Sequence, residues 1–259
     1  MRMTKKVTTM PKWLTIKQLT DKQADMFIGG EIVTDEWDDS DTSASGFRDA
    51  LQSVGDVKTI NLHINSPGGS VFEGIAIYNM LKQHQATINV YVDGLAASIA
   101  SVVAMAGNRI YMPQNAMLMI HNPWTMAVGN ATELRKQADD LDQIAKSSIT
   151  TYLSKAGDKL DEETLKQMMD EETWLTAEEA LEYGLADNVM EPNKMAASIS
   201  DKYKARYHNV PDQLIMNSSE KVDKRKNGLT DDQRQTLIEE TLNRRELVTT
   251  QLKQLQGEQ

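Results

Sequence analysis

The chain has 259 residues, of which 40% are hydrophobic and 25% are charged, a balance typical of a folded globular protein with a sizeable core. Its formal net charge of −10 opposes binding to nucleic acid or to an anionic membrane surface, because both need clustered Lys and Arg. With no cysteine, the sequence offers neither a disulfide nor a thiolate nucleophile, which fits a reducing compartment such as the cytoplasm. The segment Pro11-Lys12-Trp13 stands where a signal peptide would need an apolar run, so we expect no secretion signal.

Strands and helices alternate along the first half of the chain. The expected strands cover residues 26–33, 58–64, 87–92 and 109–112, and the expected helices cover residues 45–53, 71–84 and 98–106. This alternation predicts βαβ units around a parallel sheet, and therefore an α/β fold.

The second half is expected to complete the same domain. A strand over residues 116–120 precedes a long amphipathic helix over residues 131–156, whose apolar residues recur every three or four positions. A short helix with a Thr176 cap and a Gly184 stop follows, and a strand over residues 186–190 closes the domain.

Both ends of the chain differ in composition from this domain. We expect an N-terminal extension over residues 1–25, the main domain over residues 26–191, a polar linker over residues 192–228 and a charged helical tail over residues 229–259. Thr230 followed by Gln233 has the pattern of a capping box at the start of the tail helix. We expect the tail to serve targeting or assembly and not catalysis.

Ser98 stands where an expected strand gives way to an expected helix, in the small-residue segment Gly94-Leu95-Ala96-Ala97-Ser98. A hydroxyl at this point would be open to a substrate and could act as a nucleophile. The alternative is an ordinary helix N-cap, a position that serine also favours.

His121 follows an apolar strand and precedes the turn Asn122-Pro123. Serine is a poor nucleophile until a base removes its proton, and a neutral imidazole suits that task near pH 7. A histidine at a strand end can equally be structural. The other histidines are weaker candidates, because His63 is expected on a sheet face and His84 and His208 at the surface.

Two further segments could complete such a site. Asn65-Ser66-Pro67-Gly68-Gly69-Ser70 joins a strand to a helix, and its glycines would let backbone N–H groups face an oxyanion. A tight turn and a phosphate-binding loop are the alternatives, although the lysine of a Walker motif is missing. Asp170, Glu171 and Glu172 could supply a carboxylate that orients the histidine, or could be a solvated helix face. No spacing of histidines and carboxylates indicates a metal site, and we expect no cofactor.

In order and spacing, residues 64–69, 94–98 and 119–123 together resemble the proteolytic subunit of the Clp protease, with residues 176–185 as a fourth match. The likeness covers about residues 26–190. It implies a crotonase-like α/β fold in which residues 131–156 form the family's handle helix. It also implies homo-oligomeric rings that enclose a chamber and act on protein or peptide substrates.

The same resemblance implies a set of site residues. Ser98 would be the nucleophile, His121 the general base, and the N–H groups of Gly69 and Ile99 the oxyanion hole. Glu172 stands where the family usually has aspartate, and Asp170 is the alternative third member of the triad. The implied reaction is peptide hydrolysis through an acyl-enzyme.

Gly29-Gly30-Glu31-Ile32, the acidic segment 35–39 and Glu172-Thr173-Trp174 are similar to the phage-encoded branch of this family, which resembles head maturation proteases. This similarity implies cleavage of scaffold or capsid precursors in an assembling prohead within the host cytoplasm. The alternatives are a peptidase subunit that works with an AAA+ unfoldase, an acyl-CoA enzyme of the crotonase fold, and a non-catalytic assembly protein. Labelling of Ser98 by a fluorophosphonate would separate a peptidase from the last two.

Overall fold

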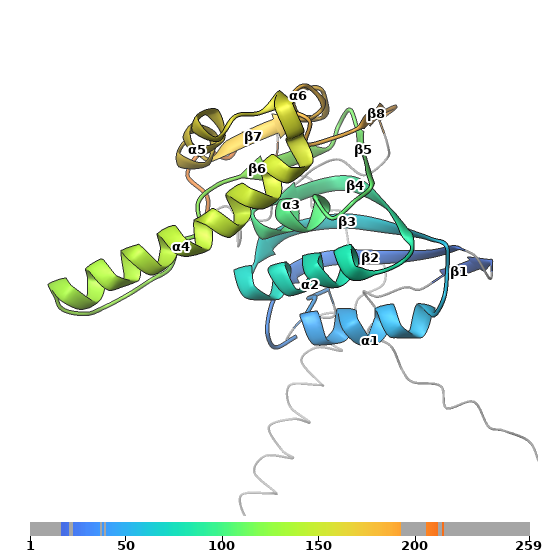
Figure 1. The fold of residues 1–259 in the computed structure, drawn as a ribbon, viewed down its shortest axis with the longest axis horizontal. Helices are drawn as coiled ribbons and strands as arrows, with labels where there is room; N and C mark the ends of the chain where they lie inside the picture. Colours follow the sequence, from blue (N-terminus) through green and yellow to red (C-terminus); the bar gives the residue numbers. More distant parts are fainter. Residues whose placement is uncertain are drawn as a thin grey trace, which may run out of the picture. The chain divides into compact units, whose positions relative to one another are not determined.

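The structure is a computed structural model that describes residues 17–20, 23–36, 38, 40–192, 206–211 and 214. Within these residues, eight strands form one sheet in the order β1-β2-β3-β4-β5-β8, while β6 pairs with β4 and β7 pairs with β6 (Figure 1). The strands are β1 (Lys17–Thr20), β2 (Gln23–Ile32), β3 (Thr59–Gly69), β4 (Thr87–Ala97), β5 (Arg109–Pro113), β6 (Met117–Ile120), β7 (Thr173–Thr176) and β8 (Asn188–Met190). The helices are α1 (Ala44–Val54), α2 (Val71–Gln83), α3 (Ile99–Ala104), α4 (Ala131–Ala156), α5 (Glu162–Asp170) and α6 (Ala177–Glu182), together with a short 3-10 helix, Gly157–Lys159.

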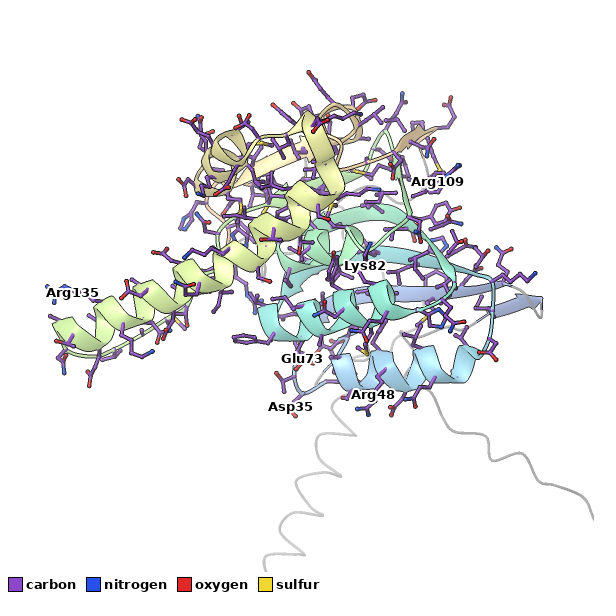
Figure 2. The ribbon with its side chains drawn as sticks, in the orientation of Figure 1. Asp35, Arg48, Glu73, Lys82, Arg109 and Arg135 are labelled. Carbon is purple, nitrogen blue, oxygen red and sulfur yellow. The ribbon has the colours of Figure 1, made fainter. Side chains whose placement is uncertain are left out.

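The central strands β2, β3, β4 and β5 are parallel, which confirms the expected α/β class. Parallel neighbours need crossover connections, and α1, α2 and α3 provide them on one face of the sheet (Figure 1). Alternate side chains such as Met26, Leu62 and Val90 point to this face and are fully buried beneath the helices. Glu73 of α2, labelled in Figure 2, also links two helices of this layer. Its Oε2 accepts the N–H of Ala44 at the start of α1 at 2.7 Å.

On the opposite face of the same strands, aromatic side chains form a row of stacked rings. The rings of Phe27, His63, Tyr91 and Tyr111 lie at one register level on β2 to β5, with neighbouring centroids 4.7, 5.0 and 4.8 Å apart. The Nδ1 of His63 is 2.9 Å from a carboxylate oxygen of Asp93. The expectation that His63 stands on a sheet face is therefore confirmed.

Several element boundaries differ from the predicted ones. The helix predicted over residues 98–106 is wrong at both ends, since it spans only Ile99–Ala104. β4 extends to Ala97 because the small residues that end it pair with both β3 and β6. α5 and β7 were not expected from the sequence, because their residues are polar or too few to show a clear period. β1 lies within the segment 1–25 and pairs antiparallel with β2.

Helix α4 has the predicted bounds. Asn130 and Glu133 form a capping box at its start, and Gly157 caps its end with a φ of 61°. The buried residues of α4 lie in its C-terminal half, while its N-terminal half projects beyond the sheet (Figure 1). In the part of the chain that the structure describes, no helix combines the length and apolar character needed to cross a membrane. The predicted tail, 229–259, lies outside the described residues.

Candidate active site

Ser98 lies at the junction of β4 and α3, in a backbone conformation that non-glycine residues rarely adopt. Its φ is 55° and its ψ is −130°, so the peptide chain turns sharply at this residue. Although Ser98 occupies the N-cap position of α3, its side chain makes no capping hydrogen bond. The helix-cap alternative therefore does not explain this serine, and strain of this kind is found at functional sites.

The general-base candidate, His121, is brought to Ser98 by the pairing of two strands. β6 lies parallel to the end of β4, with Ala97 opposite Met119, and the N–H of Ser98 bonds to the carbonyl of Met119 at 3.0 Å. His121 follows β6 directly, and its Nε2 lies 2.6 Å from Ser98 Oγ. The pair that the sequence suggested is thus within hydrogen-bond distance.

Burial lowers the pKa of His121 below its ordinary value of 6.5. The Glu172 carboxylate nearby raises this pKa and His208 lowers it, but burial is the largest effect. The imidazole of His121 is consequently neutral near pH 7, the state in which it can accept the proton of a serine hydroxyl.

β3 runs on to Gly69, beyond the expected end at Ile64, and its last residues, 65–69, are here called the glycine loop. This loop packs against the nucleophile through Gly68. Gly68 has a φ of +90°, and a Cβ at this position would lie 2.6 Å from the carbonyl oxygen of Ala97 and 2.7 Å from Ser98 Cβ. The same Cβ would be 3.2 Å from the backbone nitrogen of Ile99. Gly68 and the start of α3 therefore meet at Ser98, while the nearest neighbour of Gly69 is Ile32. Gly69 and Ile99 are the two oxyanion donors that the resemblance implies.

Side chains and backbone groups hold this loop in place. The Ser66 hydroxyl donates to the carbonyl of Gly30 at 2.6 Å and accepts the N–H of Gly68 at 3.1 Å. Asn65 Oδ1 accepts the N–H of Leu95 at 3.1 Å. The loop is therefore fixed to both neighbouring strands, as a preorganised donor site requires.

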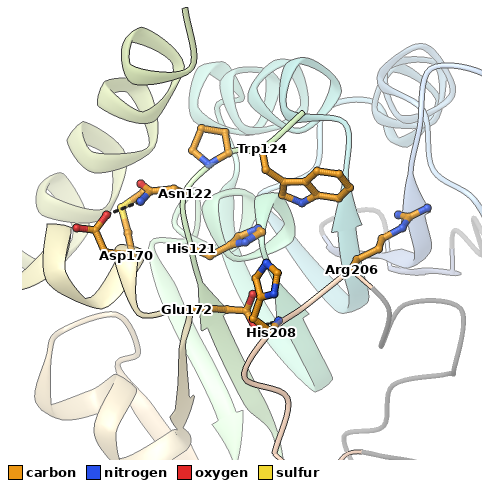
Figure 3. Close-up of a pocket in the computed structure, with 9 residues that line it drawn as sticks. His121, Asn122, Trp124, Asp170, Glu172, Arg206 and His208 are labelled. Carbon is orange, nitrogen blue, oxygen red and sulfur yellow. Dashed lines mark hydrogen bonds between the residues drawn. The ribbon is translucent and has the colours of Figure 1, made fainter. Parts of the chain in front are cut away.

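The two candidate carboxylates have different surroundings. Glu172 is 7% exposed and has a φ of 53°, and its charge acts on His121. Its Oε1 accepts the backbone N–H groups of His208 and Asn209 at 2.8 and 2.7 Å. Asp170 is exposed and accepts the Asn122 side-chain amide at 2.6 Å (Figure 3). The structure thus associates Glu172 with the imidazole more closely than Asp170.

A pocket of about 360 Å³ opens beside the imidazole (Figure 3). It is bounded on several sides by residues from the β6–α4 connection, the end of α5 and a later segment: His121, Asn122, Pro123, Trp124, Met169, Asp170, Glu172, Arg206 and His208. The pocket is large enough for one amino-acid side chain and adjoins the Ser98 and His121 pair. Among the described residues, no cluster of three or more His, Asp or Glu side chains is arranged to hold a metal ion.

Residues 206–211 were not expected at the site. Tyr207 packs edge-on against His121 and Trp174, with ring centroids 5.7 and 5.6 Å away, and its hydroxyl donates to the carbonyl of Pro67. His208, expected at the surface, is exposed but also lines the pocket. Tyr207 and Val210 both pack against the cluster of Leu95, Ala97 and Met119, and they are the local apolar signals that could have indicated packing.

The strand ends of this α/β sheet bring a strained serine within hydrogen-bond distance of a histidine, beside a glycine loop. Serine hydrolases use an arrangement of this kind. The sequence profile of the Clp protease family matches residues 8–193, and the chain therefore belongs to that family.

Two curated relatives are similar in sequence. The chain is 34% identical over 150 residues to the ATP-dependent Clp protease proteolytic subunit 1 of Salinibacter ruber, a match that covers 57% of this chain and 63% of that protein. It is 35% identical over 147 residues to the ATP-dependent Clp protease proteolytic subunit of Porphyromonas gingivalis, covering 56% of this chain and 65% of the relative. The chain thus spans slightly less than two thirds of the length of either protein.

Proposed function

We propose that this chain is a serine endopeptidase of the Clp type in which Ser98 is the nucleophile and His121 the general base. The observation that carries the proposal is the 2.6 Å distance between Ser98 Oγ and His121 Nε2 in a site where the imidazole is neutral. Ser98 Oγ attacks the scissile carbonyl carbon while its proton passes to Nε2, and the protonated imidazole then donates that proton to the leaving amine. A water molecule, deprotonated by the same imidazole, hydrolyses the acyl-enzyme.

The N–H groups of Gly69 and Ile99 are the proposed oxyanion donors, and Glu172 is the proposed third member of the triad. The close approach of Gly68 to Ser98 supports the first assignment, because a Cβ at position 68 would lie 2.7 Å from Ser98 Cβ and the loop thus adjoins the nucleophile. The burial of Glu172 beside His121 supports the second, since a buried carboxylate stabilises the imidazolium that forms during the reaction.

Covalent labelling tests this function. We expect a fluorophosphonate probe to label the wild-type chain at Ser98, and Ser98→Ala to lose both labelling and peptide hydrolysis. His121→Ala should lose about 10⁴–10⁶-fold in kcat, because the triad acts as a unit. Ser53→Ala, at an exposed position of α1, is the matched control and should react normally. Hydrolysis that persists in pure Ser98→Ala would refute the assignment.

A ring-shaped homo-oligomer is part of the same proposal. The segment before α4 and the start of that helix expose large apolar side chains, with Trp124 53%, Met126 90% and Leu134 44% exposed. Exposed apolar groups on this helix and on the segment that precedes it favour burial against other copies. Arg135 marks this free end in Figure 2. Light scattering at micromolar concentration should give a mass of several subunits, and a fully active monomer would contradict the ring.

The protein substrate distinguishes two forms of this function. Both relatives are named as proteolytic subunits of an ATP-dependent protease, which favours delivery of substrate by an ATP-driven unfoldase. The segments 35–39 and 172–174 are the basis for the alternative, a head maturation protease acting on scaffold or capsid precursors. Degradation of a folded protein only with an added unfoldase and ATP would support the first form. Cleavage of a co-expressed capsid precursor at defined sites without ATP would support the second.

A further inference from the structure

A segment beyond the family match contacts the candidate site. Residues 206–211, here called the strap, lie outside residues 8–193 and pack beside Ser98 and His121. Tyr207 contacts His121 through its ring and the loop of Gly68 through the carbonyl of Pro67. Arg206 pairs with Glu31 at the end of β2. The strap is therefore attached to both sides of the site, although the matched region ends before it.

The hydrogen bonds of the strap converge on Glu172. The N–H groups of His208 and Asn209 both bind Oε1, at 2.8 and 2.7 Å, and the Asn209 side chain donates to the carbonyl of Glu171 at 2.7 Å. A carboxylate that is only 7% exposed needs such donors, because burying a charge without hydrogen-bond partners is costly. Both N–H groups engage one oxygen and leave Oε2 without a hydrogen bond to the strap.

We propose that the strap is a positioning element of the active site, in which the N–H groups of His208 and Asn209 hold Glu172 so that its carboxylate faces His121. A glutamate is one methylene longer than the aspartate usual at this position of the family, so its carboxylate has more conformations to lose. Two donors on one oxygen remove that freedom and leave the other oxygen for the imidazole. This inference rests on the proposed peptidase function.

The geometry favours positioning over occlusion of the site. Ser98 and His121 remain partly exposed with the strap in place, and their hydrogen bond is formed at 2.6 Å. The pocket of about 360 Å³ beside His121 also remains open, and Arg206 and His208 of the strap form part of its wall. A strap that occupied the substrate's place would have closed this pocket.

Proline at position 209 tests the proposal in the full-length chain, because it removes the backbone N–H that donates to Glu172. Asn209→Ala keeps this N–H and removes only the side chain, so it is the matched control. We expect Asn209→Pro to lower kcat for a small peptide, and the rate of fluorophosphonate labelling, by about 10–100-fold, the effect of losing one hydrogen bond to a charged group. KM should change by less than about threefold, and Asn209→Ala, which loses only the side-chain bond to the carbonyl of Glu171, should lower kcat much less than Asn209→Pro does.

A double-mutant cycle separates positioning from a general structural effect. If the strap acts through Glu172, Asn209→Pro should lower kcat by less than about threefold in a Glu172→Gln background. An undiminished loss in that background, or faster labelling of Asn209→Pro than of the wild type, would overturn the proposal. His208→Pro with His208→Ala repeats the comparison at the second donor if proline at 209 disturbs folding. Wild-type chain that fails to label at Ser98 would instead refute the peptidase function itself.

Discussion

The hydroxyls of Ser101 and Tyr152 lie 2.7 Å apart in the core directly beneath the nucleophile. The Ser101 hydroxyl also points at the backbone carbonyls of Ser98 and Met119, at 2.6 and 3.0 Å. Because a serine has one hydroxyl proton, which these carbonyls accept, Tyr152 is the donor to Ser101. Burial raises the pKa of Tyr152, so its hydroxyl remains protonated and able to donate. This network connects α4 to the turn that holds Ser98.

We predict that Ser101→Ala destabilises the protein more than Tyr152→Phe. The alanine leaves a fully buried phenol without an acceptor, at a cost of about 1–3 kcal/mol, whereas the phenylalanine removes one hydrogen bond worth about 1 kcal/mol. Urea denaturation of both variants measures the difference. Equal losses would mean that the phenol finds another partner in Ser101→Ala.

Gly68→Ala should inactivate the protein without unfolding it. The added methyl group would lie 2.6 Å from the Ala97 carbonyl and 2.7 Å from Ser98 Cβ, so the loop or the nucleophile must move. A displacement of about 1 Å at a reacting group can cost on the order of 100-fold in rate. Fluorophosphonate labelling and circular dichroism together report both effects. Gly29→Ala is the control, because a Cβ there meets nothing within 4 Å; similar labelling of the two variants would contradict the expected crowding.

The carboxylate that supports His121 can be identified by comparing two variants, in each of which an amide replaces one candidate carboxylate. Glu172→Gln should lower kcat by up to about 10⁴-fold, because the amide cannot stabilise the imidazolium as the carboxylate does. Asp170→Asn should lower it by much less, since Asp170 is exposed and bonded to Asn122. Steady-state hydrolysis of a small peptide measures both. The opposite ranking would move the role to Asp170, and small losses in both would place the support elsewhere.

Much of this architecture could be predicted from the sequence, and the differences have physical causes. The bounds of α4 were predicted correctly because its apolar period is a local signal. The pairing of Ser98 and His121 was expected from the family resemblance of residues 94–98 and 119–123, and the structure brings the two side chains to 2.6 Å. The end of β4 was misassigned since Leu95, Ala96 and Ala97 suit a strand and a helix equally.

The contribution of residues 206–211 could not be predicted in the same way. Polar composition indicated a linker over residues 192–228, but residues 206–211 pack through backbone N–H groups and the side chains of Tyr207 and Val210. Backbone donors are present at every non-proline residue, so they leave no mark on the sequence. Only the arrangement of Glu172 in space shows where they are used.

The acid limb of the pH profile should lie below the ordinary pKa of histidine. Catalysis requires neutral His121, so kcat/KM falls as the pH drops through the pKa of this residue in the free enzyme. Burial places that pKa below 6.5, and we therefore expect activity to persist at pH values where an exposed histidine would already be protonated.

The carboxylate of Glu172 raises the pKa of His121, and His208 lowers it. Glu172→Gln should consequently move the acid limb to lower pH, and His208→Ala should move it to higher pH. The rate of fluorophosphonate labelling against pH gives this limb even for slow variants. Asp170→Asn is the control and should leave the limb in place, and an acid limb above pH 6.5 in the wild type would show that His121 is not the group that titrates.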